Sequence, residues 1–197
     1  MPPDENNIHE PVQDVQEEPK GRSLMGELRE MLRILIISLV IVLPIRFFVA
    51  QPFIVRGASM EPTYHDGEYL IVDELSYRFS EPDRGDVIIF RYPHDPRQFY
   101  IKRVIGLPGE TITIRNGTVS VKENGSSESI QLTEGYLRSG VNTFPDKVIT
   151  LKGNEFFVLG DNRPNSSDSR LWGTLPEEYL VGRAFLRLWP PSQLSIL

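Results

Sequence analysis

The sequence predicts an all-β fold, built mainly from antiparallel sheets and hairpins in one domain and preceded by a single transmembrane helix. Three observations support this fold class. An apolar run at residues 34–50, interrupted by Pro44 and Arg46, can just cross a bilayer core of about 30 Å with the help of its flanking residues. After it, short alternating apolar segments are separated by turns rich in Gly, Pro, Asn and Asp. About 145 residues remain for this part, the usual size of one domain with a hydrophobic core.

The amino-terminal residues 1–20 differ in composition from the rest of the chain. They are rich in Pro, Glu and Gln and nearly lack large apolar side chains, which predicts a disordered tail. They hold six acidic residues and one lysine, so they carry −5 of the net charge of −6. The remaining 20 basic and 21 acidic residues nearly cancel, which does not support nucleic-acid binding.

The chain contains no cysteine, which excludes a disulfide framework and a thiolate zinc site. No internal repeat and no nucleotide-binding glycine pattern is present. We therefore expect neither a metal nor a cofactor.

Residues 21–33 form a basic segment that flanks the predicted membrane helix. It contains three arginines: Arg22, Arg29 and Arg33. By the positive-inside rule this places the amino terminus in the cytoplasm and residues 51–197 outside. A cleavable signal peptide is the alternative interpretation of residues 34–50, but the run starts late and lacks a convincing small-residue cleavage site.

The domain that follows is predicted from nine short apolar segments, at residues 53–55, 69–72, 87–91, 98–105, 111–115, 118–121, 147–151, 155–159 and 182–188. Asn116-Gly117 predicts a type I′ hairpin between two of them, because both residues tolerate a positive φ. Prolines mark turns at residues 80–85 and 92–97. Residues of about 110–150 are expected to form an inserted hairpin region on a firmer sheet.

Ser59 lies in the stretch that directly follows the apolar run. Gly57 and Pro62 flank it, and small residues there permit a tight turn and the close approach of a substrate backbone. At about 3.3–3.6 Å per extended residue, Ser59 cannot lie more than about 30 Å from the end of that run. We expect a serine that acts on something presented at the membrane surface, and a serine in an ordinary turn is the alternative.

A serine nucleophile at its ordinary pKa needs a base. The chain has three histidines. His9 lies in the tail, whereas His65 and His94 lie in turn-like segments. A Ser-His-Asp arrangement that uses His94 remains an alternative.

Lys102 is the other candidate base. Period-two alternation places it on the same strand face as Tyr100 and Val104, with Arg103 on the opposite face. Burial on that face would lower the pKa of its amine and leave a neutral fraction at mildly alkaline pH. A solvated lysine on the surface is the alternative.

Residues 160–170 (GDNRPNSSDSR) form a dense polar loop after the apolar segment at 155–159. The loop combines hydroxyls, amides, two carboxylates and two guanidiniums. An ion pair such as Asp168 with Arg170 would rigidify it so that one serine hydroxyl orients Lys102.

These pieces, in this order, resemble the bacterial type I signal peptidases, or leader peptidases. The resemblance extends from the apolar run to Trp189 and includes residues 84–90 (RGDVIIF), 100–110 (YIKRVIGLPGE), 160–170 and 172–173 (WG). It implies a membrane-anchored serine endopeptidase that cuts exported preproteins after a small-x-small motif such as Ala-x-Ala. The catalytic domain would be residues 51–197, without cofactor or metal.

The resemblance also implies roles for individual residues. Ser59 would be the nucleophile, Lys102 the general base and Ser166 the residue that positions the lysine amine, supported by Asp168 and Arg170. The backbone amide of Ser59 would bind the oxyanion.

One departure from the family pattern and three pocket residues complete the expected site. Several members of the family carry a serine hydroxyl two positions before the nucleophile, where this chain has Gly57, so a replacement donor is expected. Val55 is a candidate pocket wall. Ile101 resembles a second wall, although simple alternation places it opposite Lys102. Met60 would pack in the pocket or touch lipid.

The expected partners are the signal peptides of preproteins and the lipid bilayer, with no nucleic acid. The expected location is the bacterial cytoplasmic membrane, spanned once, and a thylakoid membrane is the alternative. Two other functions remain: a self-cleaving Ser-Lys protease of the repressor type, disfavoured by the apolar run and by the lack of a DNA-reading helix pair, and a non-catalytic membrane-tethered β-domain that binds a partner.

Overall fold

A computed structural model describes residues 24–48 and 50–196 of the chain. The tail predicted at residues 1–20, and the first three residues of the basic segment, lie outside the described residues. The chain divides into two compact units, Met1–Ile41 and Val42–Leu197. The second unit consists mainly of antiparallel strands with a few short helices, so the predicted β fold is confirmed.

Helix α1 (Leu24–Phe48) is 25 residues long and joins the basic segment to the apolar run without a break. Glu27 in its first turn interacts favourably with the helix dipole. Among the described residues, no helix combines the length and the hydropathy needed to cross a membrane. The membrane helix predicted at residues 34–50 is therefore not confirmed.

The larger sheet has eight antiparallel strands in the order β1-β2-β11-β3-β4-β9-β10, with β12 paired to β11. The strands are β1 (Ala50–Ile54), β2 (Tyr69–Asp73), β3 (Val87–Tyr92), β4 (Asp95–Gly106), β9 (Glu155–Leu159), β10 (Leu175–Pro176), β11 (Leu180–Trp189) and β12 (Ser195–Ile196). β4 begins three residues before its predicted start, because Tyr92 pairs with Asp95 across a loop of only Pro93 and His94. The turn predicted at residues 92–97 is thus shorter than expected.

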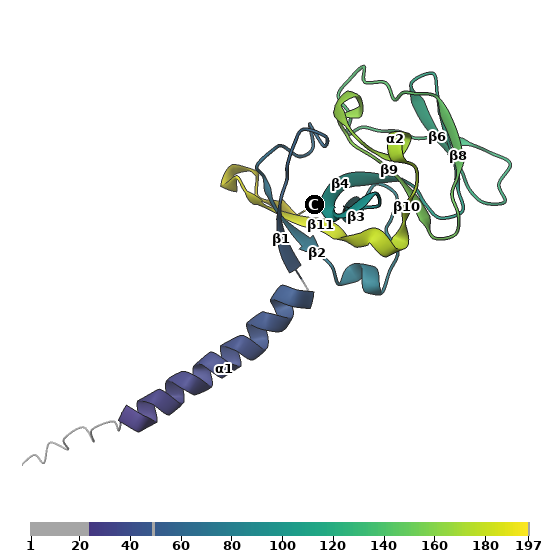
Figure 1. Cartoon of the computed structure of the whole chain (residues 1–197). Helices are drawn as coiled ribbons and strands as arrows, with labels where there is room; N and C mark the ends of the chain where they lie inside the picture. Colours follow the sequence, from purple (N-terminus) through teal and green to yellow (C-terminus); the bar gives the residue numbers. More distant parts are fainter. Residues whose placement is uncertain (1–23, 49, 197) are drawn as a thin grey trace, which may run out of the picture. The chain divides into compact units, whose positions relative to one another are not determined.

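A second, four-stranded sheet in the order β7-β6-β5-β8 makes up the predicted hairpin region. It contains β5 (Thr111–Arg115), β6 (Thr118–Lys122), β7 (Ile130–Gln131) and β8 (Lys147–Thr150). Asn116 and Gly117 have φ angles of 52° and 80°, which confirms the predicted hairpin turn. Figure 1 shows β6 and β8 beside α2 and β9.

The short helical segments lie in the connections between the strands, and the sequence did not predict them. They are α2 (Ser169–Trp172) and four 3-10 turns, η1 (Ser76–Arg78), η2 (Arg163–Asn165), η3 (Glu177–Tyr179) and η4 (Pro191–Gln193). The Asp168 side chain caps α2 by accepting a hydrogen bond from the backbone N–H of Arg170. This cap fixes the end of the polar loop.

The core is organised by β9, whose five residues are all buried. Phe156 and Val158 pack into a cluster with β3 and β4, whereas Phe157 and Leu159 pack into a cluster with the four-stranded sheet. This alternation follows from the period of two in a strand, and each large apolar side chain contributes about 1.5–3 kcal/mol by burial. β9 therefore joins the two sheets, and β4 is held firmly beside it.

Candidate active site

Ser59 lies in the turn between β1 and β2. Backbone hydrogen bonds from Val55 N to Glu68 O (2.9 Å) and from Gly67 N to Val55 O (3.0 Å) close this turn. Gly57 has a φ of 81°, a conformation that other residues rarely adopt, and its N–H donates to Asp66 Oδ1 at 2.7 Å. The turn therefore presents Ser59 in a fixed, partly exposed position.

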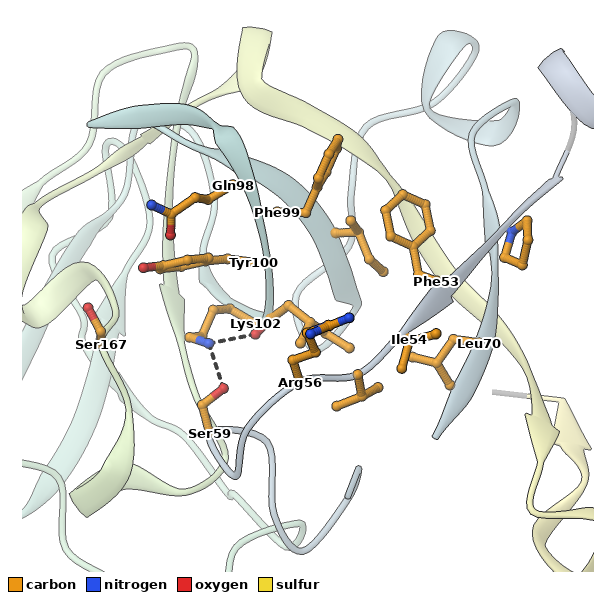
Figure 2. A pocket seen from close by; sticks show the side chains of 14 residues that line it. Phe53, Ile54, Arg56, Ser59, Leu70, Gln98, Phe99, Tyr100, Lys102 and Ser167 are labelled. Carbon is orange, nitrogen blue, oxygen red and sulfur yellow. Dashed lines mark hydrogen bonds between the residues drawn. The ribbon is translucent and has the colours of Figure 1, made fainter. Parts of the chain in front are cut away.

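Lys102 of β4 meets Ser59 in space although 43 residues separate them. Its Nζ lies 2.8 Å from Ser59 Oγ and donates a second hydrogen bond of 2.7 Å to the carbonyl oxygen of Ile101 (Figure 2). The ring centroid of Tyr100 lies 5.5 Å from the same nitrogen. The predicted alternation is confirmed, because Arg103 points elsewhere and binds Asp161 at 2.6 Å.

The electrostatic surroundings of Lys102 favour the neutral amine. The side chain is 4% exposed. Burial lowers the pKa of Lys102 to about 8, an effect that the charges of Asp168 and Asp161 partly oppose. A neutral amine at hydrogen-bond distance from a hydroxyl can accept its proton, so the pair has the geometry of a nucleophile and its base.

Asp168 and Arg170 form the predicted ion pair, which builds the polar loop beneath the site. Asp168 accepts hydrogen bonds from Arg170 Nε at 2.8 Å and from Gly160 N at 3.1 Å. Arg170 also donates to the carbonyl oxygens of Phe144 (2.8 Å) and Arg163 (2.7 Å). Both side chains are buried, where charge-assisted hydrogen bonds of this kind are short and strong.

Ser166 lies near Ser59 but does not bind the lysine amine. A Cβ atom added at Gly160 would overlap the Ser166 hydroxyl and lie 2.5 Å from the carbonyl oxygen of Ser59. The Ser166 hydroxyl is buried and has no hydrogen-bond partner among the described residues. The expected orientation of Lys102 by Ser166 is not observed, and the amine binds the carbonyl oxygen of Ile101 instead.

Asn162 is a site residue that the sequence did not single out. Its backbone N–H donates to the carbonyl oxygen of Ser59 at 3.0 Å, and its Nδ2 donates to that of Ala58 at 2.9 Å. One residue of the polar loop therefore holds the peptide units on both sides of Ser59. The amide side chains of the polar loop were the only sequence feature that pointed to Asn162. A contact between residues about 100 positions apart produces no local periodicity in the sequence.

Arg163 links the polar loop to the segment before β8. Its side chain is 1% exposed and pairs with Glu134 at 2.5 Å, with a further hydrogen bond to Thr143. Buried charges need such partners, since an unpaired guanidinium would lose its hydration without compensation. The loop that carries Ser166 is thus fixed from two sides.

A cavity of about 710 Å³ opens beside Ser59 and Lys102. It is lined by Pro52, Phe53, Ile54, Val55, Arg56, Ser59, Leu70, Ile89, Gln98, Phe99, Tyr100, Ile101, Lys102 and Ser167. Figure 2 shows Ser167 on one side of the Ser59–Lys102 pair and Phe53, Ile54 and Leu70 on the other. The cavity therefore combines apolar walls with a few polar groups, the Ser59–Lys102 pair among them, as ligand-binding cavities usually do.

Two of the three predicted pocket residues line this cavity. Val55 and Ile101 do so, although Ile101 was placed opposite Lys102 by simple alternation. Met60 is 0% exposed and packs in the core with Tyr64 and Val72. The prediction that Met60 contacts substrate or lipid is therefore not supported, because the turn directs its side chain inward.

The histidines of the described residues lie away from this pair. His94 is exposed and its ring packs on Tyr92, while His65 contacts Glu68 at 3.3 Å. Neither lines the cavity, so the Ser-His-Asp alternative finds no support in the geometry. Within the part of the chain that the structure describes, no group of three or more acidic and histidine side chains could hold a metal ion.

Comparison with known proteins agrees with these features. The sequence model of a family described as signal peptidase, peptidase S26, matches residues 28–189. A signal peptidase I from Leptolyngbya laminosa is 39% identical over 196 residues, which cover 95% of this chain and 91% of that protein. A probable signal peptidase I-1 from Synechocystis sp. is 37% identical over 173 residues, which cover 84% and 85%.

A crystal structure of a signal peptidase I from Enterococcus faecalis V583 is 32% identical and covers 53% of this chain and 97% of its own, with a TM-score of 0.44. The resemblance to signal peptidases predicted from the sequence is confirmed, and the chain belongs to the signal peptidase family, peptidase S26.

Proposed function

We propose that this protein is a serine endopeptidase that removes amino-terminal signal peptides from exported preproteins. In this proposal Ser59 and Lys102 form a catalytic dyad, and cleavage follows a small-x-small motif. The observation that carries it is the 2.8 Å contact between the Ser59 hydroxyl and a buried lysine amine. Membership of the signal peptidase family supports the choice of substrate.

The chemistry follows from the neutral amine. Lys102 takes the proton of the Ser59 hydroxyl as the oxygen attacks the carbonyl carbon of the scissile peptide bond, whose C–N bond then breaks. The resulting ammonium then protonates the leaving amine, which departs as the new amino terminus of the mature protein. A water molecule that gives its proton to Lys102 attacks the acyl-enzyme, and Ser59 regains its proton as the signal peptide leaves.

The oxyanion of each tetrahedral intermediate is assigned to the backbone N–H of Ser59. Among the described residues this N–H donates no intramolecular hydrogen bond. Asn162 holds the carbonyl groups on both sides of it, which orients the peptide unit in advance. Pre-oriented donors of this kind contribute about 10²–10³-fold to rate in serine proteases. Gly57 supplies no hydroxyl, so the orientation of this N–H gains importance.

Two free strand edges support binding of an extended peptide. Within the described residues β1 pairs with β2 alone. On the second side of β4, pairing with β9 starts only at Arg103, so the earlier residues of β4 have none of the described strands beside them there. Residues 98–102 and the continuation of β1 line the cavity, and neither has a neighbouring strand on that side in the described part of the chain. A peptide strand could add to these edges by main-chain hydrogen bonds, with Val55 and Ile101 beside its small side chains.

The proposal includes anchoring in the bacterial cytoplasmic membrane by residues 34–50, with the amino terminus in the cytoplasm. The apolar run and the arginines before it support this arrangement. Extraction of membranes with alkaline carbonate should leave the chain in the pellet. Protease added outside should reach the domain at residues 51–197. Release into the supernatant would contradict the anchor, and a thylakoid location would show in fractionation.

The dyad is tested with the full chain in detergent and a preprotein whose signal peptide ends in Ala-x-Ala. Ser59→Ala and Lys102→Ala should each lower kcat/KM at least about a thousandfold, since each removes an essential partner in proton transfer. Ser127→Ala and Lys122→Ala are matched controls, because both residues are exposed and neither lines the cavity. Near-normal cutting by either dyad variant, with its fold verified by thermal melting, would refute the proposal.

A further inference from the structure

Arg56 has a charged side chain that the proposed chemistry does not use. It lines the same cavity as Ser59 and Lys102, and its side chain is exposed to solvent. No group within residues 24–48 and 50–196 pairs with its guanidinium. Most other arginines of the β-domain that lie near the site are bound, as Arg103 is to Asp161 and Arg170 to Asp168. A free guanidinium at the rim of a binding cavity is available to a ligand.

The cavity offers a bound peptide positive charge and no negative side chain. None of its fourteen lining residues is Asp or Glu, and two are basic, Arg56 and Lys102. Arginine side chains in proteins keep their proton, whereas the base must be neutral when it acts. A cavity with charge of one sign attracts ligand groups of the opposite sign. When Lys102 is neutral, the Arg56 guanidinium is therefore the remaining positive charge among the residues that line the cavity.

The position of Arg56 along the strand identifies which substrate residue it meets. Val55, its neighbour, is 4% exposed and faces inward. Successive side chains of an extended chain point to opposite faces, so Arg56 faces outward. Figure 2 shows the Arg56 side chain between the Ser59–Lys102 pair and the side chains of Phe53 and Ile54.

A substrate strand beside residues 53–56 follows the same alternation. The two small residues of the small-x-small motif point inward beside Val55, and the middle residue points outward on the side of Arg56. We propose that Arg56 reads the middle residue of the cleavage motif and favours preproteins with Asp or Glu at that position over those with Lys or Arg. This inference rests on the proposed function, because it assumes that a peptide is cut at Ser59.

The test compares three peptides that differ only at the middle position of an Ala-x-Ala motif, with Asp, Asn or Lys. The wild-type chain should cut the Asp peptide about 1.5- to 5-fold faster in kcat/KM than the Asn peptide, the range expected of an exposed ion pair, and the Lys peptide slowest. The preference should shrink in 1 M salt, where charges are screened within about 3 Å. Arg56→Gln should remove the preference and Arg56→Glu should reverse it.

Arg115→Gln is the matched control, because Arg115 is an exposed arginine at the hairpin of the other sheet. It should keep the wild-type preference. The inference is overturned if Arg56→Gln retains the order Asp, Asn, Lys, or if it slows all three peptides equally. A vesicle-binding measurement tests the alternative that Arg56 binds lipid headgroups. The inference is also overturned if Arg56→Gln keeps the peptide preference but binds vesicles with phosphatidylglycerol no better than vesicles of phosphatidylcholine.

A binding measurement separates this inference from the proposed function. Fluorescence anisotropy of the same three labelled peptides on the Ser59→Ala chain reports the preference without any cutting. The proposed function fails if the wild-type chain cuts none of the peptides. The role of Arg56 still stands in that case if the Ser59→Ala chain binds the peptides in the order Asp, Asn, Lys and the Ser59→Ala, Arg56→Gln double variant binds them equally. Equal binding of all three peptides by the Ser59→Ala chain would refute the role of Arg56.

Discussion

The pH dependence of cutting tests the state of Lys102 directly. If the rate follows the neutral amine with a pKa of about 8, then about 9% of the enzyme is active at pH 7, half at pH 8 and about 90% at pH 9. The value of kcat/KM should therefore rise about tenfold between pH 7 and pH 9 and then level off. A lysine at its ordinary pKa of 10.5 would give about a hundredfold rise over the same interval with no plateau.

The assay measures initial rates of preprotein cutting in overlapping buffers at constant ionic strength from pH 6 to pH 10. Lys102→Arg should stay at background throughout, because a guanidinium does not lose its proton in this range. Lys122→Arg, an exposed control, should reproduce the wild-type profile. A rate that climbs steadily to pH 10, or a profile governed by a group near pH 6.5, would refute the assignment of a buried neutral lysine as base.

The same shift predicts how stability changes with pH. Because the folded pKa of Lys102 lies below its unfolded value of 10.5, the unfolded chain binds more protons between pH 8 and pH 10.5. The free energy of unfolding should rise across that window by about 3 kcal/mol relative to a Lys102→Met variant, and the difference should be constant below pH 7. Urea unfolding of both chains at pH 7 and pH 10 measures it.

Three further predictions concern the support of the site. Gly160→Ala should abolish cutting, since its Cβ would overlap the neighbouring hydroxyl, whereas Gly153→Ala, with open space around it, should cut normally in the same assay. Asn162→Ala should lower kcat about fivefold at unchanged melting within a few degrees, because the Ala58 carbonyl loses its side-chain donor, worth about 1 kcal/mol, while the backbone N–H of residue 162 still binds the Ser59 carbonyl. Glu134→Ala should lower the free energy of unfolding by about 3–5 kcal/mol, since it leaves the buried Arg163 charge unpaired; a loss below 1 kcal/mol in urea would contradict this.

Much of the fold could be predicted because its signals are local. Strands β5 and β9 begin and end where the alternation does, and Asn116-Gly117 defines the turn after β5 by backbone conformation alone. The strands β7, β10 and β12 were missed because two residues cannot display a period of two. Their pairing depends on neighbouring strands that lie far away in the sequence.

The site could be predicted in part for the same reason. Ser59 and Lys102 each have a local pattern, a small-residue turn and a face of an alternating strand, and the family resemblance joined them. The contacts of Asn162 were invisible, because they connect the turn at Ser59 to a loop about 100 residues later. Met60 was misplaced because adjacency to the nucleophile does not determine on which side of a turn a side chain points.

The way Asn162 and Arg163 secure the reactive turn has a consequence for biosynthesis. The nucleophile is translated early, but the loop that steadies it, and the Glu134 that steadies the loop, come 75 or more residues afterwards. A nascent chain that emerges amino terminus first thus carries a serine with no working surroundings. The groups that position Ser59 are synthesised only in the last third of the polypeptide. We therefore expect an incomplete chain not to cut other proteins.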